Sequence, residues 1–182
     1  QHGGINVVIR SSNPALVKVA PNATTVSTDS IVIPLANGTT GFSYVIAGED
    51  LVTGQASISA QAVGFTDAVT TATVATPMIQ LSGAVTTRSA GGLDDPFFVQ
   101  VGLPVANLST LNTAQARRAG ASPLVVTLTS TAPAIGTFVT TGQVGGSLTV
   151  AIAAGASASP STVATGGIAL RYLSPGTTDI SV

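Results

Sequence analysis

The side chains able to do chemistry in this sequence are few, and the acidic ones include two adjacent pairs. Glu49-Asp50 and Asp94-Asp95 each lie in a stretch that predicts a turn. Carboxylates are ligands for Ca²⁺, which takes roughly six to eight oxygens, so these four residues are the candidate metal ligands. Two adjacent carboxylates supply too few oxygens, and an Asp in a turn ordinarily accepts hydrogen bonds from nearby backbone N–H groups. We therefore predict no metal and no cofactor, with Ca²⁺ at either pair as the alternative.

Groups suited to catalysis are poorly represented. The one histidine, His2, lies beside the N-terminus, whereas a Ser-His-Asp arrangement needs a buried and oriented imidazole. The sequence contains no Gly-x-Ser-x-Gly nucleophile elbow, no phosphate-binding loop and no Gly-x-Gly-x-x-Gly fingerprint. Cysteine is absent, which excludes disulfides and thiolate metal ligands. The sequence thus predicts that the chain is not an enzyme.

Charge is scarce and nearly balanced, which limits the partners. Charged residues make up 7% of the chain and the net charge is −1, whereas ordinary soluble domains are about 25% charged. The basic residues form no stripe that would neutralise phosphates, so nucleic acid is excluded as a partner. Arg117-Arg118 is an adjacent basic pair that we assign to a connection between strands, with a docking patch as the alternative. No unbroken stretch of about 18 apolar residues exists, so no membrane insertion is predicted.

The remaining composition favours an extracellular or cell-surface protein of a bacterium. Thr, Ser, Val, Ala and Gly are abundant, while Lys, Glu and Cys are rare or absent. Asn22, Asn37 and Asn107 each begin an Asn-x-Ser/Thr pattern. Such patterns arise easily in a Thr-rich chain, so we interpret them as chance matches unless the source glycosylates its proteins.

The elements that must position these residues are strands, because the dominant hydrophobic period is two. Alternation runs through short segments rich in β-branched residues, as in strands with one buried and one wetted face. These segments are Ile5–Arg10, Ile31–Ile33, Phe42–Ile46, Ala56–Ala60 and Val69–Val74. Turn residues separate them at roughly the 8–12-residue spacing of a β-sandwich. The sequence predicts an all-β fold with antiparallel sheets.

One segment departs from this period and predicts a short helix. Residues 111–120 contain helix formers, possible caps at Thr110 or Asn112, two arginines in the last turn and a closing Gly120. We expect at most one short helix in the chain, near residues 111–119.

A weak internal repeat runs through the chain. Residues 7–15 resemble residues 126–134, and Ile31–Ile33 then meets Val150–Ile152 at the same offset of 119 residues. Further on, residues 51–54 resemble 173–176 and Ile58-Ser59 resembles Ile180-Ser181 at an offset of 122 residues. The order of strand, Ser/Thr-x-Pro corner, turn and Gly-led strand is kept. We predict two modules, 1–76 and 77–182.

The corner Ser11-Ser12-Asn13-Pro14-Ala15, the strand led by Gly54 and the Gly64-Phe65-Thr66 turn resemble bacterial Ig-like repeats. The resemblance implies tandem immunoglobulin-like antiparallel β-sandwiches, as found in surface proteins and adhesins. It implies a structural repeat or spacer of a bacterial fibre or adhesin, with other copies or neighbouring repeats as partners. A carbohydrate- or receptor-binding module is one alternative, and an accessory domain of an extracellular hydrolase or phage tail protein is another.

The two modules differ in completeness, which predicts open sheet edges. The first has no room for a leading strand equivalent to Pro96–Val101, and the second stops at Val182, before an equivalent of Val69–Val74. Unpaired backbone groups along such edges favour addition of a strand. We expect the final strand of the second module to come from outside residues 1–182, either from a longer chain or from another subunit. In the second case the segment up to Arg10 is the expected donor, giving self-assembly by strand addition.

Overall fold

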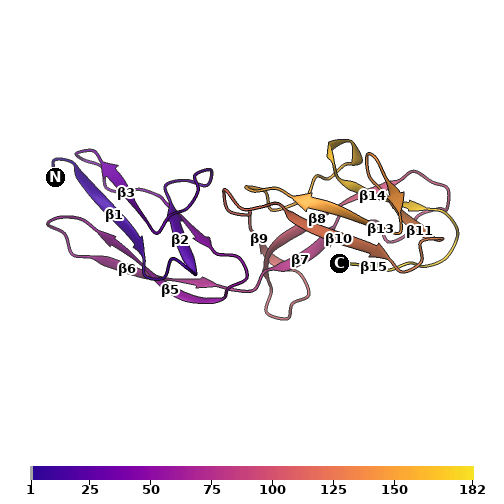
Figure 1. The fold of residues 1–182 in the computed structure, drawn as a ribbon, viewed down its shortest axis with the longest axis horizontal. Coiled ribbons are helices and arrows are strands. Elements are labelled where there is room, and N and C mark those ends of the chain that lie inside the picture. Colours follow the sequence, from indigo (N-terminus) through magenta and orange to yellow (C-terminus); the bar gives the residue numbers. More distant parts are fainter. Residues whose placement is uncertain (1) are drawn as a thin grey trace. The chain divides into compact units, whose positions relative to one another are not determined.

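The computed structural model describes residues 2–182 and is all-β, as the hydrophobic period predicts. Strands occupy 46% of the chain and helix 2%, and every pairing between named strands is antiparallel. The chain divides into two compact units (Figure 1). The first runs to Thr76 and also includes Arg118–Ala121, which the predicted boundaries assign to the second module. The second consists of Pro77–Arg117 and Ser122–Val182.

The first unit contains six strands in two sheets. They are β1 (Ile5–Ser11), β2 (Val17–Ala20), β3 (Ser30–Leu35), β4 (Val45–Gly48), β5 (Gly54–Gln61) and β6 (Ala68–Val74). One sheet has the order β3-β1-β5-β6, and β2 pairs with β4 in the other. Buried side chains from both sheets form one core cluster, which includes Ile9 of β1, Val19 of β2 and Ile58 of β5. Alternate residues of β1 supply this core, as a strand with one buried face requires. Because β1 pairs with β3 and with β5, the prediction that the segment up to Arg10 is a donor strand for another subunit is wrong.

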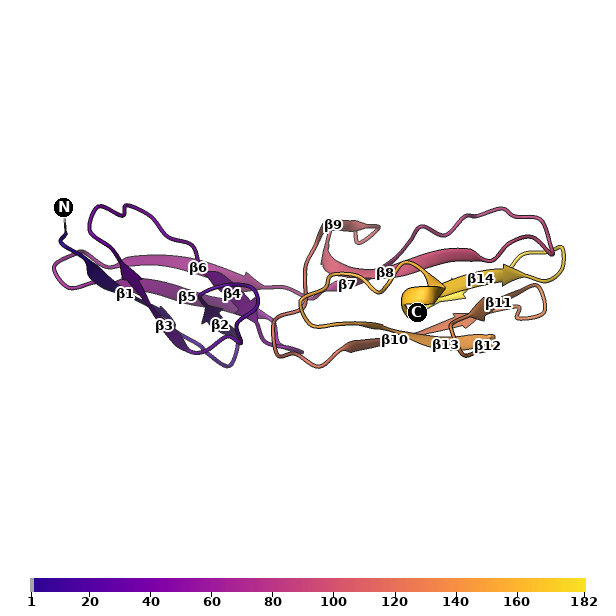
Figure 2. The same cartoon turned by 90° about the horizontal axis from the view of Figure 1, so that it is seen from above.

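The second unit contains nine strands. They are β7 (Met78–Ser82), β8 (Asp95–Pro104), β9 (Leu111–Ala114), β10 (Leu124–Ser130), β11 (Gly136–Val139), β12 (Val144–Gly145), β13 (Ser147–Ile152), β14 (Ile168–Tyr172) and β15 (Ile180–Ser181). One sheet has the order β13-β10-β15, and the other has the order β12-β11-β14-β8-β7 with β9 beside β8. Figure 2 shows β10 and β13 in a layer separate from β7 and β8.

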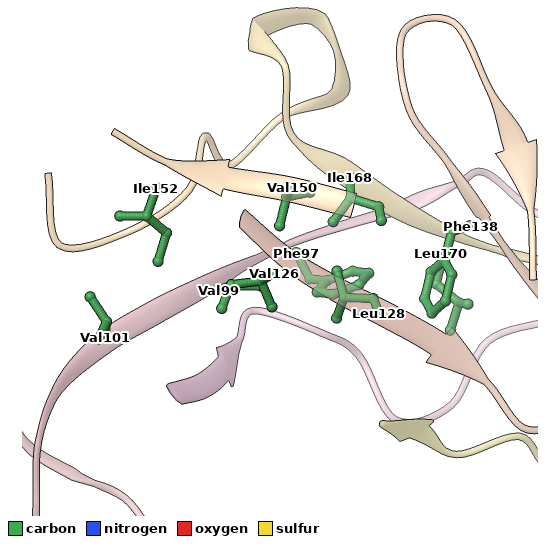
Figure 3. Close-up of a cluster of buried hydrophobic side chains, with 10 residues drawn as sticks. All are labelled: Phe97, Val99, Val101, Val126, Leu128, Phe138, Val150, Ile152, Ile168 and Leu170. Carbon is green, nitrogen blue, oxygen red and sulfur yellow. The ribbon is translucent and has the colours of Figure 1, made fainter. Parts of the chain in front are cut away.

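The core of the second unit is filled from both of these sheets (Figure 3). Phe97 of β8 and Phe138 of β11 are fully buried, with ring centroids 6.1 Å apart. Aliphatic side chains of β10, β13 and β14 surround them. The neighbouring Phe98 faces the other side of β8. Its ring packs on Gly83, 3.3 Å from the point where a Cβ on that glycine would lie. Phe98 therefore packs within its own unit.

The prediction of a short helix near residues 111–119 is wrong. Leu111–Ala114 forms strand β9, and the one helix among residues 2–182 is a 3₁₀ turn at Val163–Thr165. Strand β9 pairs with β8, and the Leu111 N–H also donates to Gln80 Oε1 at 2.7 Å. Asn and Thr in this segment have weak helix propensity, so pairing with an existing sheet edge outweighs local preference.

Candidate functional site

The first acidic pair lies in the loop after β4 and is neutralised by two basic side chains. Glu49 contacts Lys18 Nζ at 3.0 Å and Arg118 Nη2 at 2.9 Å. Asp50 lies 3.3 Å from the same Arg118 nitrogen. Arg118 Nη1 also donates to the carbonyl oxygen of Gly48 at 3.2 Å. This cluster ties Arg118–Ala121 to the rest of the first unit.

The second acidic pair meets two other arginines. Asp94 accepts a bidentate pair of hydrogen bonds from Arg171, at 2.7 and 2.8 Å. The arginine lowers the pKa of the Asp94 carboxyl, chiefly through these hydrogen bonds. Asp95 is only 3% exposed and accepts from Arg88 at 3.1 Å and from the backbone N–H of Val85 at 2.7 Å. A buried carboxylate such as Asp95 requires such compensation, which here comes from the half-exposed Arg88 and a backbone N–H.

Tyr172 extends this second cluster. Its hydroxyl donates to the Val85 carbonyl oxygen at 2.7 Å. Burial raises the pKa of the Tyr172 phenol, and the nearby Asp95 carboxylate adds to that rise. The combination holds residues 85–95 against β14 and keeps the phenol in its neutral, donating form.

Neither acidic pair is arranged as a calcium site. Within residues 2–182 no group of three His, Cys, Asp or Glu residues gathers around one point. Each pair already has a guanidinium within 3.3 Å, so a metal ion there would face a fixed positive charge. The four candidate residues therefore act, in this structure, as acceptors in ion pairs.

The other residues singled out by the sequence also serve the fold. The His2 Nε2 atom lies 2.9 Å from the Thr39 carbonyl oxygen, and its ring meets Phe65 edge-on at 6.5 Å. Arg117 donates to the Ser122 carbonyl oxygen at 2.9 Å, so the adjacent arginines 117 and 118 bind different backbone oxygens. No local signal marks Arg171 as an ion-pair partner, because Asp94 and Arg171 are 77 residues apart in sequence. Arg88 lies only seven residues before Asp95, within reach of a local search for opposite charges.

The surface hollow beside Lys18 is open and shallow. An open depression of about 410 Å³ is lined by Lys18 and by residues 27–30. Lys18 is already paired with Glu49, and the rest of the lining is Ser, Thr and Asp29. This depression lacks the apolar walls and convergent polar groups of a small-molecule site. No helix among residues 2–182 is long and apolar enough to cross a membrane.

The most distinctive surface feature is an open sheet edge in the first unit. Strand β4 pairs with β2 on one side, and no strand among the described residues pairs with its other side. Ile46 in the middle of β4 is 41% exposed, and Phe42 just before it is 38% exposed. The rings of Phe42 and Tyr44 lie 6.2 Å apart. An apolar sheet edge of this kind is a template for pairing with another strand.

Comparisons with protein-family models, with curated proteins and with solved structures find no match for this chain.

Proposed function

We propose that this chain is a pair of Ig-like β-sandwich repeats and serves as a structural spacer unit of an extracellular bacterial fibre or large surface adhesin. The supporting observation is that the two units pair their strands in the same pattern.

In the β1-containing sheet of the first unit, Ser11 lies opposite Ile58. In the second unit Ser130 lies opposite Ile180, and these residues follow the first pair by 119 and 122 positions. Those are the two offsets found by comparing the sequences. Strands β1 and β10 thus occupy equivalent central places, with β3 and β13 on one side and β5 and β15 on the other.

The facing sheets correspond in the same way. Val19 of β2 lies opposite Ile46 of β4, and Phe138 of β11 lies opposite Leu170 of β14. Val19 and Phe138 are again 119 positions apart, and both are fully buried. The equivalent core position holds the smaller side chain in the first unit and the larger one in the second.

The corner that suggested the Ig-like family has one hydrogen-bonding arrangement in both units. The Leu16 N–H donates to the Asn13 carbonyl oxygen at 3.0 Å, and the Ile135 N–H donates to the Ala132 carbonyl oxygen at 2.9 Å. Each corner leads from a strand of one sheet into a strand of the other. Such crossings between two packed sheets are typical of Greek-key sandwiches.

A structural role is consistent with how the polar side chains are used. The acidic pairs and their basic partners fasten loops to strands, and they leave few charges to recognise a charged ligand. A surface rich in Thr and Ser and poor in charge suits packing beside neighbouring repeats. We propose on these grounds that the chain is not an enzyme.

A second candidate function is carbohydrate or receptor binding by the first unit. The observation that favours it is the exposure of Phe42 and Phe65 on the surface of this unit. Aromatic rings stack on apolar ligand faces, so Phe42→Ala and Phe65→Ala would abolish glycan binding if this candidate holds.

The spacer role is tested by pulling the chain from its two ends in a single-molecule force experiment. Two unfolding steps are expected, because the units have separate cores. At about 3.3–3.6 Å per extended residue, unfolding of the first unit should lengthen the chain by about 250–270 Å and unfolding of the second unit by about 350–380 Å, each less the folded span of that unit. One combined step, or extension without any resistance, would contradict the proposal.

A further inference from the structure

We propose that the outer edge of β4 is an acceptor site for a strand from another polypeptide, and that this strand has the alternating apolar pattern of β8. The inference rests on the correspondence between units given under the proposed function, and it specifies the partner of a strand-adding assembly. It concerns the first unit.

The second unit shows what occupies the equivalent edge. Strand β14, the counterpart of β4, pairs with β11 on one side and with β8 on the other. Ile168 lies opposite Phe97, and Leu170 lies opposite Asp95. Counting from the equivalence of Leu170 and Ile46, the residue of the first unit that matches Ile168 is Tyr44.

The hydrogen-bonding side of β8 is fixed by three observations. Pro96 lies opposite Ala169 and has no N–H, so the pairs on either side of it carry the hydrogen bonds. Val101 N–H donates to the Ser157 carbonyl oxygen at 2.9 Å, and Val99 accepts from the Ser159 N–H at 2.9 Å. Odd-numbered residues of β8 therefore direct their backbone groups toward β14, while Phe98 directs its backbone groups toward β7.

The same backbone positions of β4 point toward an edge without a strand. The Glu49 N–H donates to the Leu16 carbonyl oxygen at 2.9 Å, which places the odd-numbered residues of β4 toward β2. Ile46 then directs its backbone groups outward, as Leu170 does toward β8. Continuing the alternation to Tyr44, just before β4, gives the match to Ile168. The difference in burial follows this pattern: Leu170 is 4% exposed and Ile46 is 41% exposed. An added strand would cover apolar surface as well as pair backbone groups.

The two edges also end in the same way. The Tyr172 carbonyl oxygen accepts the Gly91 N–H at 2.8 Å, just beyond the β8 pairing. At the matching place in the first unit, the Gly48 carbonyl oxygen accepts Arg118 Nη1 at 3.2 Å. The closed end leaves Tyr44 and Ile46 as the open part of the edge, which sets the register of the incoming strand.

The chemistry of the partner follows from β8 itself. Phe97, Val99 and Val101 are buried and alternate with Phe98 and Gln100. An acceptable strand has apolar side chains at alternate positions and an aromatic one opposite Tyr44. Strand β8 of the same molecule lies inside its own sheet, so among the described residues it is not free to fill the β4 edge. The occupant that we propose is a β8-like segment of another chain.

The experiment uses residues 1–182 and a fluorescent peptide with the sequence of residues 94–103, Asp94 to Leu103. Two peptides differ only in where one backbone nitrogen is methylated, at Phe97 or at Phe98. Methylation at Phe97 removes the N–H that would bond the β4 edge, while methylation at Phe98 removes one that points away. We expect the first to bind at least tenfold more weakly than the second. In parallel, the amide protons of Tyr44 and Ile46 should exchange with solvent more slowly when the unmethylated peptide is bound.

A matched pair of chain variants locates the site. Ile46→Lys places a charge on the open edge and should weaken peptide binding at least tenfold. Val32→Lys is the control, because Val32 is an exposed residue of edge strand β3 in the other sheet. Equal binding of the two methylated peptides, slower exchange in β14 instead of β4, or an equal loss in both variants would overturn the proposal. Concentration-dependent pairing of the chain with itself through β4 that the peptide fails to displace would overturn it as well.

The two proposals fail separately. Two unfolding steps under force without peptide binding would leave the spacer role intact and remove the acceptor site. Peptide binding at β4 in a chain that unfolds in one step would do the reverse.

Discussion

The equivalence of β4 and β14 predicts different costs for the same truncation at matching positions. Leu170→Ala and Ile46→Ala each remove three side-chain carbons. Leu170 lies opposite the fully buried Phe138, and Ile46 lies opposite the fully buried Val19. Leu170 belongs to the closed core beneath β8, so its truncation leaves a cavity and should cost about 2–5 kcal/mol. Full burial of such a side chain is worth about 1.5–3 kcal/mol, and roughly three-fifths of Ile46 is covered. Its truncation should therefore cost about 1–2 kcal/mol, without a sealed cavity.

The measurement must separate the two units, and the sequence provides one reporter for each. The chain has two tyrosines, Tyr44 in the first unit and Tyr172 in the second. Incorporation of fluorotyrosine gives one ¹⁹F signal per unit, and urea titration of each signal yields that unit's free energy of unfolding. Equal losses in the two variants, or a larger loss for Ile46→Ala, would refute the view that a missing neighbour strand leaves β4 exposed.

Two further variants test the local geometry. A Cβ at Gly102 would collide with the Thr113 carbonyl group of β9, so Gly102→Ala should cost about 1–3 kcal/mol or more in urea titration. Gly142→Ala is its control, because nothing lies within 4 Å of a Cβ there. A comparable loss in both would contradict the role of close packing between β8 and β9. The lowered pKa of Asp94 means that the unfolded chain binds its proton more readily, so this group's contribution to stability is present above about pH 4 and is lost as pH falls through the folded-state pKa. Asp94→Asn should flatten this acid dependence in a pH series of unfolding titrations, and an unchanged slope would refute it.

Most strands were predictable because their signal is local, although the segment predicted at Phe42–Ile46 forms its strand later, at Val45–Gly48. Alternation between Ile5 and Arg10, or between Ala56 and Ala60, reports directly which face of a strand is buried. The error at residues 111–120 has the opposite origin. Nothing in Leu111–Ala114 alone announces the edge of β8 or the glycine that lets β9 approach it. Contacts between residues distant in sequence decided that segment.

The internal repeat shows how far a period of two can be trusted. Sequence comparison aligns Ile31 with Val150, whereas the pairing of Ile31 with Ile9 and of Leu148 with Leu128 makes Leu148 the matching position. The difference is two residues. Because side chains alternate with a period of two, a shift by two leaves every apolar residue on its proper face. The pattern therefore identifies the strand but does not fix its register, which only the ladder of hydrogen bonds defines.

The candidate site was only partly predictable for a related reason. The acidic pairs were visible in the sequence as turn residues, but their partners Lys18, Arg118 and Arg171 come from distant segments, and only Arg88 is local. The sequence indicates that carboxylates are present. The fold determines that each acidic pair forms ion pairs with arginine. The same holds for the open edge of β4, since its exposure becomes evident only beside the covered edge of β14.

The scarcity of charge links these features. Natural sheet edges are commonly protected by charged side chains, especially lysine, that discourage pairing with other chains. Here the nearest charges, Lys18, Glu49 and Arg118, are bound to one another at the Gly48 end of β4. They close that end and leave Tyr44 and Ile46 without a charge between them. A sheet edge that is protected from pairing with other chains commonly carries a charged side chain at its centre. The present arrangement instead blocks one end and leaves an apolar centre, which limits where an added strand can lie without preventing it from binding.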